Sequence, residues 1–246
     1  MLQVSDLSFA GILSGISFQA GPGEIVGIVG ENGAGKTTLL KAILFHNKET
    51  GGSISICGRE IDTLSRRVIA RHFAYIPQSF SVDFDVRVQD FLYHSRYAYD
   101  ENRNSSARKI EEAAELCSVT GFLEKNLRLL SGGERQRVML CSAVVQNAPV
   151  WLCDEPTSNL DPKAEADFFN LLEKIRKERQ LTALLVSHNL QQIVRHSDKI
   201  LALRNGRVLY YEPASFFTAE IFSNIYNARF TMLEHGGRKH IVTGDA

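Results

Sequence analysis

Residues 30–37 read Gly30-Glu31-Asn32-Gly33-Ala34-Gly35-Lys36-Thr37 and fit the pattern GxxxxGK[ST]. It follows an apolar stretch, 24–29, and opens a helical pattern, 36–46. Glycines at this junction let backbone N–H groups surround phosphate oxygens, and the helix start adds its partial positive charge. We expect Lys36 to reach the β- and γ-phosphates and Thr37 to ligate Mg²⁺. The alternative is a glycine-rich turn before an ordinary helix, a chance match in on the order of one chain in a hundred.

Two adjacent acidic residues, Asp154 and Glu155, end the apolar stretch 150–153. In a parallel sheet, the carboxyl ends of the strands form the ligand crevice, so we expect this pair beside the phosphate loop. Asp154 is a candidate ligand of hydrated Mg²⁺, which usually takes only one or two protein carboxylates. Glu155 is a candidate general base for an attacking water. On its own, such an acidic pair is more often an ordinary strand end; the upstream phosphate loop favours the functional interpretation.

The composition predicts a folded protein of the cytosol. The chain has 246 residues with 44% hydrophobic content, and its 28 basic side chains balance its 28 acidic ones. A net charge of zero argues against a broad nucleic-acid footprint, so no nucleic-acid partner is expected. Neither a signal-peptide layout nor an apolar stretch of membrane-spanning length is found. The four widely spaced cysteines, Cys57, Cys117, Cys141 and Cys153, are expected to be buried, reduced thiols.

Strand and helix patterns alternate along the chain. We expect strands at 16–20, 24–29, 53–57, 73–76, 150–153 and 182–187, and a hairpin whose turn is Asn205-Gly206. Helices are expected at 36–46, from a cap at Ser105 or Ser106 through 117, at 134–145, and from the cap Asp161 to about 177. Apolar strands alternating with helices predict an α/β fold with a mainly parallel sheet. No linker divides the chain, and only its last dozen residues are expected to be loose.

The string Leu-Ser-Gly-Gly-Glu-Arg-Gln-Arg at 130–137 resembles the signature motif of ATP-binding-cassette (ABC) ATPases. Gln78 is similar to the Q-loop glutamine, residues 158–161 (Ser-Asn-Leu-Asp) to the D-loop, and His188 to the switch histidine. This resemblance covers essentially the whole chain. It implies a P-loop NTPase of ABC-ATPase type, with an N-terminal antiparallel β subdomain and an α-helical signature subdomain. It also implies one domain over 1–246, with the helical part at about 80–145 inserted in a RecA-like core and a loose tail at about 235–246.

The resemblance implies ATP and Mg²⁺ as cofactors and a head-to-tail homodimer in which each ATP is shared. In that arrangement the signature residues of one copy close over the γ-phosphate held by Lys36 of the other. The implied trans residues are Ser131, Gly132, Gly133, Glu134 and Asp161. The implied nucleotide-binding residues are Gly30, Glu31, Asn32, Gly33, Ala34, Gly35, Lys36, Thr37 and Thr38. Phe9 is either a ring on which adenine stacks or a core residue, and the sequence favours neither. A stacked adenine would gain roughly 1–3 kcal/mol of binding free energy.

The resemblance also assigns the catalytic and metal-binding roles. Glu155, His188 and Gln78 are the implied catalytic residues. Thr37, Gln78 and Asp154 are the implied Mg²⁺ ligands. His188 is expected to hydrogen-bond the γ-phosphate, and Gln78 to touch Mg²⁺ or the water and to sense an attached partner.

The aromatic content of residues 73–99 predicts a partner surface. This segment holds eight aromatic residues, a share well above the 9% of the whole chain: Phe73, Tyr75, Phe80, Phe84, Phe91, Tyr93, Tyr97 and Tyr99. Some must be core. In transporters of the family this region receives a short helix of a separate membrane permease, a helix-in-groove contact. The resemblance therefore implies a peripheral protein at the cytoplasmic face of the membrane, with polytopic permease subunits and an extracytoplasmic solute-binding protein acting through them.

The finer resemblance is to importer ATPases for iron–siderophore, haem and cobalamin, and residues 84–91, 95–97 and 222–226 carry it. The first of these stretches is equally similar to manganese and zinc importers. A soluble cassette, such as one that assists iron–sulfur cluster assembly, is a further alternative. His235 and His240 are interpreted as solvated tail residues in preference to a metal sensor.

Overall fold

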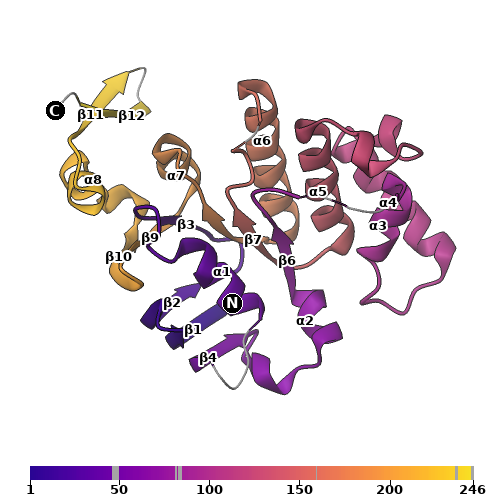
Figure 1. Cartoon of the computed structure of the whole chain (residues 1–246), viewed down its shortest axis with the longest axis horizontal. Coiled ribbons are helices and arrows are strands. Elements are labelled where there is room, and N and C mark those ends of the chain that lie inside the picture. Colours follow the sequence, from indigo (N-terminus) through magenta and orange to yellow (C-terminus); the bar gives the residue numbers. More distant parts are fainter. Residues whose placement is uncertain (46–49, 81, 83–84, 159, 236–237, 245–246) are drawn as a thin grey trace. The chain divides into compact units, whose positions relative to one another are not determined.

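The computed structural model describes residues 1–246 except 46–49, 81, 83–84, 159, 236–237 and 245–246 (Figure 1). Phe84, one of the aromatic residues noted above, and Asn159 of the D-loop lie outside the described residues. The chain divides into two compact units, residues 1–63 with 182–246, and residues 64–181. Among the described residues, no helix is both long and apolar enough to cross a bilayer.

The first unit begins with the antiparallel sheet that the resemblance implies. Its strands β1 (Leu2–Phe9), β2 (Leu13–Ala20), β4 (Gly51–Ile56) and β5 (Arg59–Glu60) lie in the order β2-β1-β4-β5. Along β2, Ile16, Phe18 and Ala20 are buried and the residues between them are exposed, because successive side chains of a strand point to opposite faces. The 3₁₀ turn η1 (Ile61–Thr63) closes this part.

Parallel strands in the same unit carry the phosphate loop. Strands β3 (Ile25–Val29), β8 (Thr182–Val186), β9 (Lys199–Arg204) and β10 (Arg207–Pro213) lie in the order β10-β9-β3-β8, and only β10 is antiparallel. Every residue of β3 and β8 is buried, as expected for strands covered on both faces. Helices α1 (Lys36–Leu44) and α7 (Leu190–His196) follow β3 and β8 along the chain. Asn205 and Gly206 both have positive φ, which confirms the predicted hairpin turn.

The expectation of a loose C-terminal tail is wrong for residues 238–243. After η4 (Ala214–Phe216) and α8 (Ala219–Tyr226), strands β11 (Phe230–His235) and β12 (Arg238–Thr243) pair antiparallel. Six residue pairs make this ladder, and the Ile241 N–H also donates to the Gln191 side chain on α7, at 3.0 Å. The polar composition of the tail concealed a strand whose hydrogen bonds come from its backbone.

The second unit holds the helices between two parallel strands. Strand β6 (Phe73–Ile76) pairs in register with β7 (Val150–Asp154). Helices α2 (Arg66–His72), α3 (Val88–His94), α4 (Arg103–Leu116), α5 (Gly132–Gln146) and α6 (Pro162–Arg179), with η2 (Thr120–Phe122) and η3 (Leu127–Leu129), complete it. The predicted cap Asp161, before Pro162, is confirmed. The cap of α4 is Asn102, whose side chain accepts from the Ser105 N–H, so the prediction of Ser105 or Ser106 is wrong. The division into one domain with a helical insertion stays a prediction.

Three of the four cysteines are buried, as expected, and Cys57 is exposed. The expectation of burial is wrong for Cys57, which lies in the turn between β4 and β5 with φ +51, because such connections ordinarily run over the surface. Burial raises the pKa of the Cys153 thiol, and a hydrogen bond with Cys117 together with burial raises that of Cys141. These two thiols therefore stay protonated at neutral pH.

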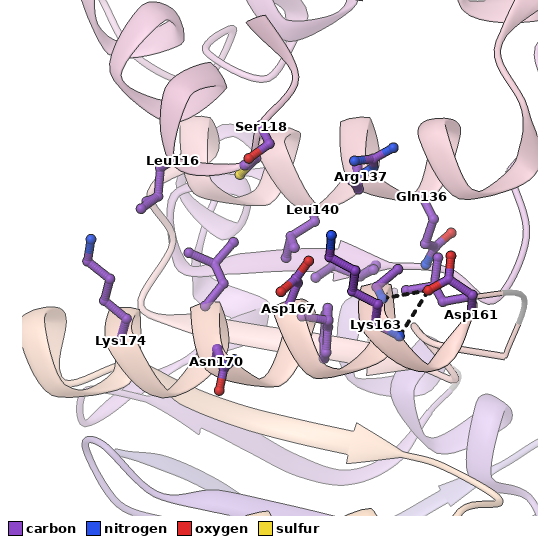
Figure 2. A pocket seen from close by; sticks show the side chains of 16 residues that line it. Leu116, Ser118, Gln136, Arg137, Leu140, Asp161, Lys163, Asp167, Asn170 and Lys174 are labelled. Carbon is purple, nitrogen blue, oxygen red and sulfur yellow. Dashed lines mark hydrogen bonds between the residues drawn. The ribbon is translucent and has the colours of Figure 1, made fainter.

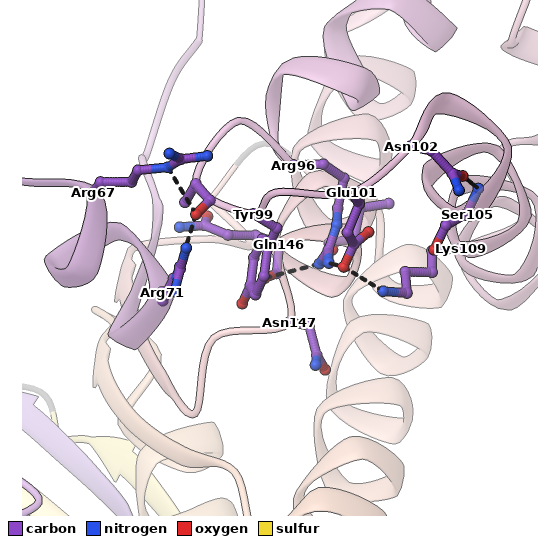
Figure 3. Close-up of polar contacts among 12 residues, drawn as sticks. Arg67, Arg71, Arg96, Tyr99, Glu101, Asn102, Ser105, Lys109, Gln146 and Asn147 are labelled. Atoms are coloured by element: carbon purple, nitrogen blue, oxygen red, sulfur yellow. Dashed lines mark hydrogen bonds and ion pairs between the residues drawn. The ribbon is translucent and has the colours of Figure 1, made fainter.

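A buried arginine, Arg96, organises the second unit (Figure 3). Its side chain is 4% exposed, donates to the carbonyl of Val145 near the end of α5 at 2.7 Å, and pairs with Glu101. The guanidinium lies 3.7 Å from the centre of the Tyr99 ring. Burial alone would raise the pKa of Glu101, but the hydrogen bonds from Lys109 and Arg96 outweigh it and lower that pKa. Arg96 thus joins the loop after α3 to the end of α5.

We expect Arg96→Met to lower the free energy of unfolding by about 3–5 kcal/mol, because it removes the buried ionic partner of Glu101. The Glu101 carboxylate would keep its ion pair with Lys109. Urea denaturation measures this loss. The matched control is Arg108→Met on α4, whose side chain is 83% exposed and pairs with Glu112 one turn away. That change should cost less than about 0.5 kcal/mol. Equal, small losses in both variants would contradict the role given to Arg96.

Candidate active site

The phosphate loop has the backbone that its glycines predict. Gly30, Gly33 and Gly35 have φ values of +146, +79 and +99, which side-chain-bearing residues rarely adopt. A Cβ on Gly30 would lie 2.3 Å from the carbonyl oxygen of Leu203 on β9. Glycine is therefore required at Gly30 for two reasons, conformation and close approach.

The Lys36 side chain lies inside the phosphate loop and bonds to its first two carbonyls. Its side chain is 8% exposed, and its Nζ donates to the carbonyls of Gly30 at 2.7 Å and of Glu31 at 2.9 Å. A buried ammonium needs such acceptors, because its desolvation is costly. Thr37 and Thr38 are half-buried in the first turn of α1, and the loop tip is exposed at Glu31, Asn32 and Gly33.

The loop packs against the β9–β10 turn and the start of β2, both in the same unit. The Gly206 N–H, in the β9–β10 turn, donates to the Ala34 carbonyl at 3.1 Å, and a Cβ on Gly35 would lie 2.8 Å from Leu13 Cδ2. Phe9 ends β1, is half-buried and lines an open hollow of about 510 Å³ that Asn205 also lines. Both interpretations of Phe9, adenine stacking and core, therefore stay open.

The second unit holds the acidic pair, and the two carboxylates differ in environment. Asp154 is 3% exposed, and its Oδ2 accepts from the Tyr75 hydroxyl at 3.0 Å. Burial, and then the charge of Asp154, raise the pKa of Tyr75, so this hydroxyl stays a donor. The sequence analysis treated Tyr75 only as one of eight aromatic residues. The feature that could have indicated its role is its hydroxyl, because Tyr75 lies on the strand that pairs with β7.

Glu155 is held in an unusual conformation beside Gln78. Its φ is +48, in the left-handed region, where a residue other than glycine costs of order 1–3 kcal/mol. The Gln78 Nε2 donates to Glu155 Oε2 at 2.8 Å. The structure therefore brings together two residues that the sequence predicted for one site.

The signature residues form a helix start with a capping box. Ser131 is the N-cap of α5: its hydroxyl accepts from the Glu134 N–H at 3.3 Å, and its N–H donates to Glu134 Oε2 at 2.8 Å. The hydrogen bond from the Ser131 backbone lowers the pKa of Glu134. Gly132 and Gly133 occupy the first two helical positions, where helix geometry supplies no acceptor for the N–H groups.

Gln136, one turn into α5, is a residue that sequence reasoning missed. It is buried, and its Nε2 donates to the Pro156 carbonyl at 2.8 Å, directly after Glu155. Figure 2 shows Gln136 and Asp161 at one end of a cavity of about 630 Å³ between α5 and α6. Asp161 is committed to its cap, since its Oδ1 accepts from the N–H groups of Lys163 and Ala164 at 2.9 Å each. Gln136 stands between Arg135 and Arg137, so the local sequence carried no signal that it is buried.

His188 lies exposed after β8 in the first unit, and Asn189 then caps α7. The first unit thus carries Phe9, the phosphate loop and His188, and the second carries Gln78, the signature residues, Asp154, Glu155 and Asp161. The predicted placement of Asp154 and Glu155 beside the phosphate loop stays a prediction.

The donor set fits Mg²⁺ in its chemistry. Magnesium prefers oxygen ligands and is usually held by one or two carboxylates. The candidates offer the buried Asp154 carboxylate, fixed by Tyr75, together with the Thr37 hydroxyl and the Gln78 amide oxygen. Within the described part of the chain, no group of three or more His, Cys, Asp or Glu side chains is gathered as for a metal. The loop and its buried lysine are those of a P-loop nucleoside triphosphatase.

Comparisons with known proteins specify the family. The family model "ABC transporter" matches residues 13–158. The chain is 31% identical to the hemin import ATP-binding protein HmuV of Bordetella parapertussis, over 92% of this chain and 90% of that protein. It is 31% identical to the manganese transport system ATP-binding protein MntB of Halalkalibacterium halodurans, over 87% and 85%. The chain therefore belongs to the ATP-binding proteins of the ABC transporter family.

Solved structures agree on the fold. A putative metal-chelate type ABC transporter in an inward-facing conformation matches with a TM-score of 0.85 at 22% identity, covering 99% of this chain and 97% of that one. A dimeric cassette bound to ADP and Pi matches with a TM-score of 0.78 at 24% identity, covering 88% and 100%. The fold is that of an ABC ATPase, as predicted, and the chain is an ATPase that uses ATP and Mg²⁺.

We expect Tyr75→Phe to lower the free energy of unfolding by about 1.5–3 kcal/mol, since it removes a hydrogen bond to a buried carboxylate and keeps the ring. The midpoint of urea denaturation at constant slope measures this. The control is Tyr97→Phe, because the Tyr97 side chain is 62% exposed. If the two variants unfold at the same urea concentration as the unmodified chain, the Tyr75–Asp154 bond contributes nothing.

Proposed function

We propose that this chain is the energy-coupling ATPase of an importer for an iron complex, haem or cobalamin. It works as a homodimer at the cytoplasmic face of the membrane, beneath separate polytopic subunits that receive solute from an extracytoplasmic binding protein. The observation that carries the proposal is the likeness to import proteins over almost the whole chain. The hemin import protein described above is joined by the petrobactin import ATP-binding protein FpuC of Bacillus anthracis, 29% identical over 90% of this chain and 83% of that protein.

In the proposed mechanism, each active site is shared between two copies. Backbone N–H groups of the phosphate loop and the Lys36 ammonium hold the phosphates, and Ser131 and Gly133 of the other copy close over the γ-phosphate. Asp154, Thr37 and Gln78 would hold Mg²⁺, which when bound would neutralise phosphate charge. ATP joins the two copies, and loss of the γ-phosphate loosens them.

Glu155 is the proposed general base, and His188 orients the γ-phosphate and the water. The Gln78 hydrogen bond at 2.8 Å supports this role, because it fixes one carboxylate oxygen. The left-handed backbone at Glu155 supports it too, since strained residues cluster at functional sites. A water proton would pass to the Glu155 carboxylate as the water oxygen attacks the γ-phosphorus. The bond from that phosphorus to the β–γ bridging oxygen would break, and ADP and inorganic phosphate would be the products.

The proposed surface for the membrane subunit includes the aromatic residues after β6 that remain outside the core. The rings of Phe80 and Phe91 lie 5.3 Å apart and are half-buried, and Tyr97 is 62% exposed. Phe73, by contrast, is buried, and the Tyr99 hydroxyl donates to the Gln146 carbonyl at 2.9 Å. The segment therefore divides into inner residues that hold the fold and outer ones suited to an apolar partner helix.

Import of manganese is the second candidate. It is favoured by the MntB proteins of Halalkalibacterium halodurans and of Bacillus subtilis, the latter 32% identical over 91% of this chain and 89% of that protein. The two candidates share the same ATPase chemistry. They differ in the membrane and binding subunits, on which solute selection depends.

We expect Glu155→Gln to retain ATP binding, to cut turnover by roughly 10²–10⁴-fold, and to accumulate as a dimer with ATP–Mg²⁺. Light scattering after size exclusion measures the dimer. The matched control is the double variant Glu155→Gln with Ser131→Arg, which should bind ATP and remain monomeric. A Glu155→Gln protein that stays monomeric at saturating ATP–Mg²⁺ would refute the shared site.

The importer proposal is tested by co-purification and transport. The tagged chain, extracted in detergent from its own cells, should carry a polytopic subunit. Vesicles that hold this complex should take up haem, a ferric chelate or cobalamin only with ATP inside. Uptake of Mn²⁺ in place of these would establish the second candidate. A soluble scaffold as the sole partner would overturn both.

A further inference from the structure

The first residue of the phosphate loop, Gly30, is held at both of its peptide groups. Its N–H donates to the hydroxyl of Tyr226 at 3.2 Å, although 196 residues separate the two in sequence. Its carbonyl accepts from Lys36 Nζ at 2.7 Å. One glycine therefore links the Tyr226 hydroxyl to the ammonium of Lys36.

Gly30 needs such a restraint because the sheet stops supporting the chain at this point. The last pair between β3 and β9 is Val29 with Ala202, so Gly30 leaves the ladder. Glycine also has the widest backbone freedom of any residue. A hydrogen bond to its N–H therefore limits the rotation of the peptide that begins the loop.

Tyr226 is itself fixed by the C-terminal segment. Phe222, one turn earlier on α8, is fully buried, and the ring of Tyr226 lies 5.8 Å from that of Phe230 on β11. Arg204 on β9 donates to the Asn224 carbonyl, and the Asn224 side chain donates to the Tyr210 hydroxyl at 3.0 Å. These contacts anchor α8 to the β9–β10 hairpin, so the Tyr226 hydroxyl is presented from a rigid base.

The hydroxyl also keeps its proton. Burial raises the pKa of Tyr226, although the hydrogen bond from Gly30 acts in the opposite direction. A neutral hydroxyl adds no negative charge to a loop that must receive phosphate.

We propose that Tyr226 is a positioning residue for ATP: its hydroxyl fixes the peptide that joins Val29 to Gly30, from which the chain departs into the next peptide, whose carbonyl accepts from Lys36. The proposal rests on the proposed role of Lys36 in binding phosphate. It gives the end of helix α8 a part in nucleotide binding.

The test is Tyr226→Phe, which keeps the ring and its packing and removes only the hydroxyl. We expect the Kd and the KM for ATP–Mg²⁺ to rise about fivefold to tenfold, the loss typical of an unsatisfied buried donor. The turnover number should stay within about twofold, because a binding interaction was removed and the hydrolytic groups were not touched. Amide exchange at Gly30, followed by NMR, should become faster.

Tyr210→Phe is the matched control. It removes one hydrogen bond of the same helix and keeps the other anchors, which are the buried Phe222 and the bond from Arg204 to the Asn224 carbonyl. Gly30 is untouched, so the ATP affinity should stay within twofold of that of the unmodified chain. Affinity within twofold of normal in Tyr226→Phe, or an equal loss in Tyr210→Phe, would overturn the proposal, the second result assigning the effect to helix packing. Lys36→Ala separates the two levels: if it binds ATP normally, the phosphate-loop assignment fails and the Tyr226 inference with it. If Lys36→Ala loses binding and Tyr226→Phe does not, only the inference about Tyr226 fails.

Discussion

The burial of one positive charge, the Lys36 ammonium, governs the first unit. A nearly buried cation must be surrounded by acceptors, and here these include two carbonyls of the loop that the lysine ends. The chain reaches that arrangement only by curling through backbone conformations that glycine adopts readily. The buried strand β3, which lies beside the buried β8, fixes the start of the phosphate loop. The hydrogen bond from Gly206 to the Ala34 carbonyl holds the loop near its end.

Local chemistry made much of this predictable. The glycine spacing before Lys36, the Asp161-Pro162 helix start and the Asn205-Gly206 turn each have one strongly preferred backbone solution. The predictions failed in two situations. Either two nearby residues were equally suitable for the same role, or the structure depended on a contact between residues far apart in the sequence. Asn102 and Ser105 are both good caps, and only the fold decides between them. The β12 strand is defined by its pairing with β11, and the Tyr226–Gly30 contact spans 196 residues. A sequence motif reveals neither the pairing of two strands nor a contact between residues so far apart in the sequence.

The signature serine illustrates how one group can meet two demands. Its hydroxyl caps α5 by accepting from Glu134, and a hydroxyl has a proton left to donate. The reciprocal bond from the Ser131 N–H to Glu134 holds the carboxylate at the helix start. The capping box therefore holds the Ser131 hydroxyl at the positive end of the α5 dipole. A second copy would meet a surface already ordered by α5 itself.

Gly206 shows how closely the turns of the first unit are joined. Its N–H reaches Ala34, its carbonyl accepts from Ser14, and a Cβ there would lie 1.7 Å from the Ile12 carbonyl oxygen. Hairpin tips are ordinarily the places where a domain tolerates extra residues. This tip is a three-way junction, so a fluorescent reporter or an affinity tag spliced between Asn205 and Gly206 would push the nucleotide loop out of shape. Engineers of this cassette should attach labels elsewhere.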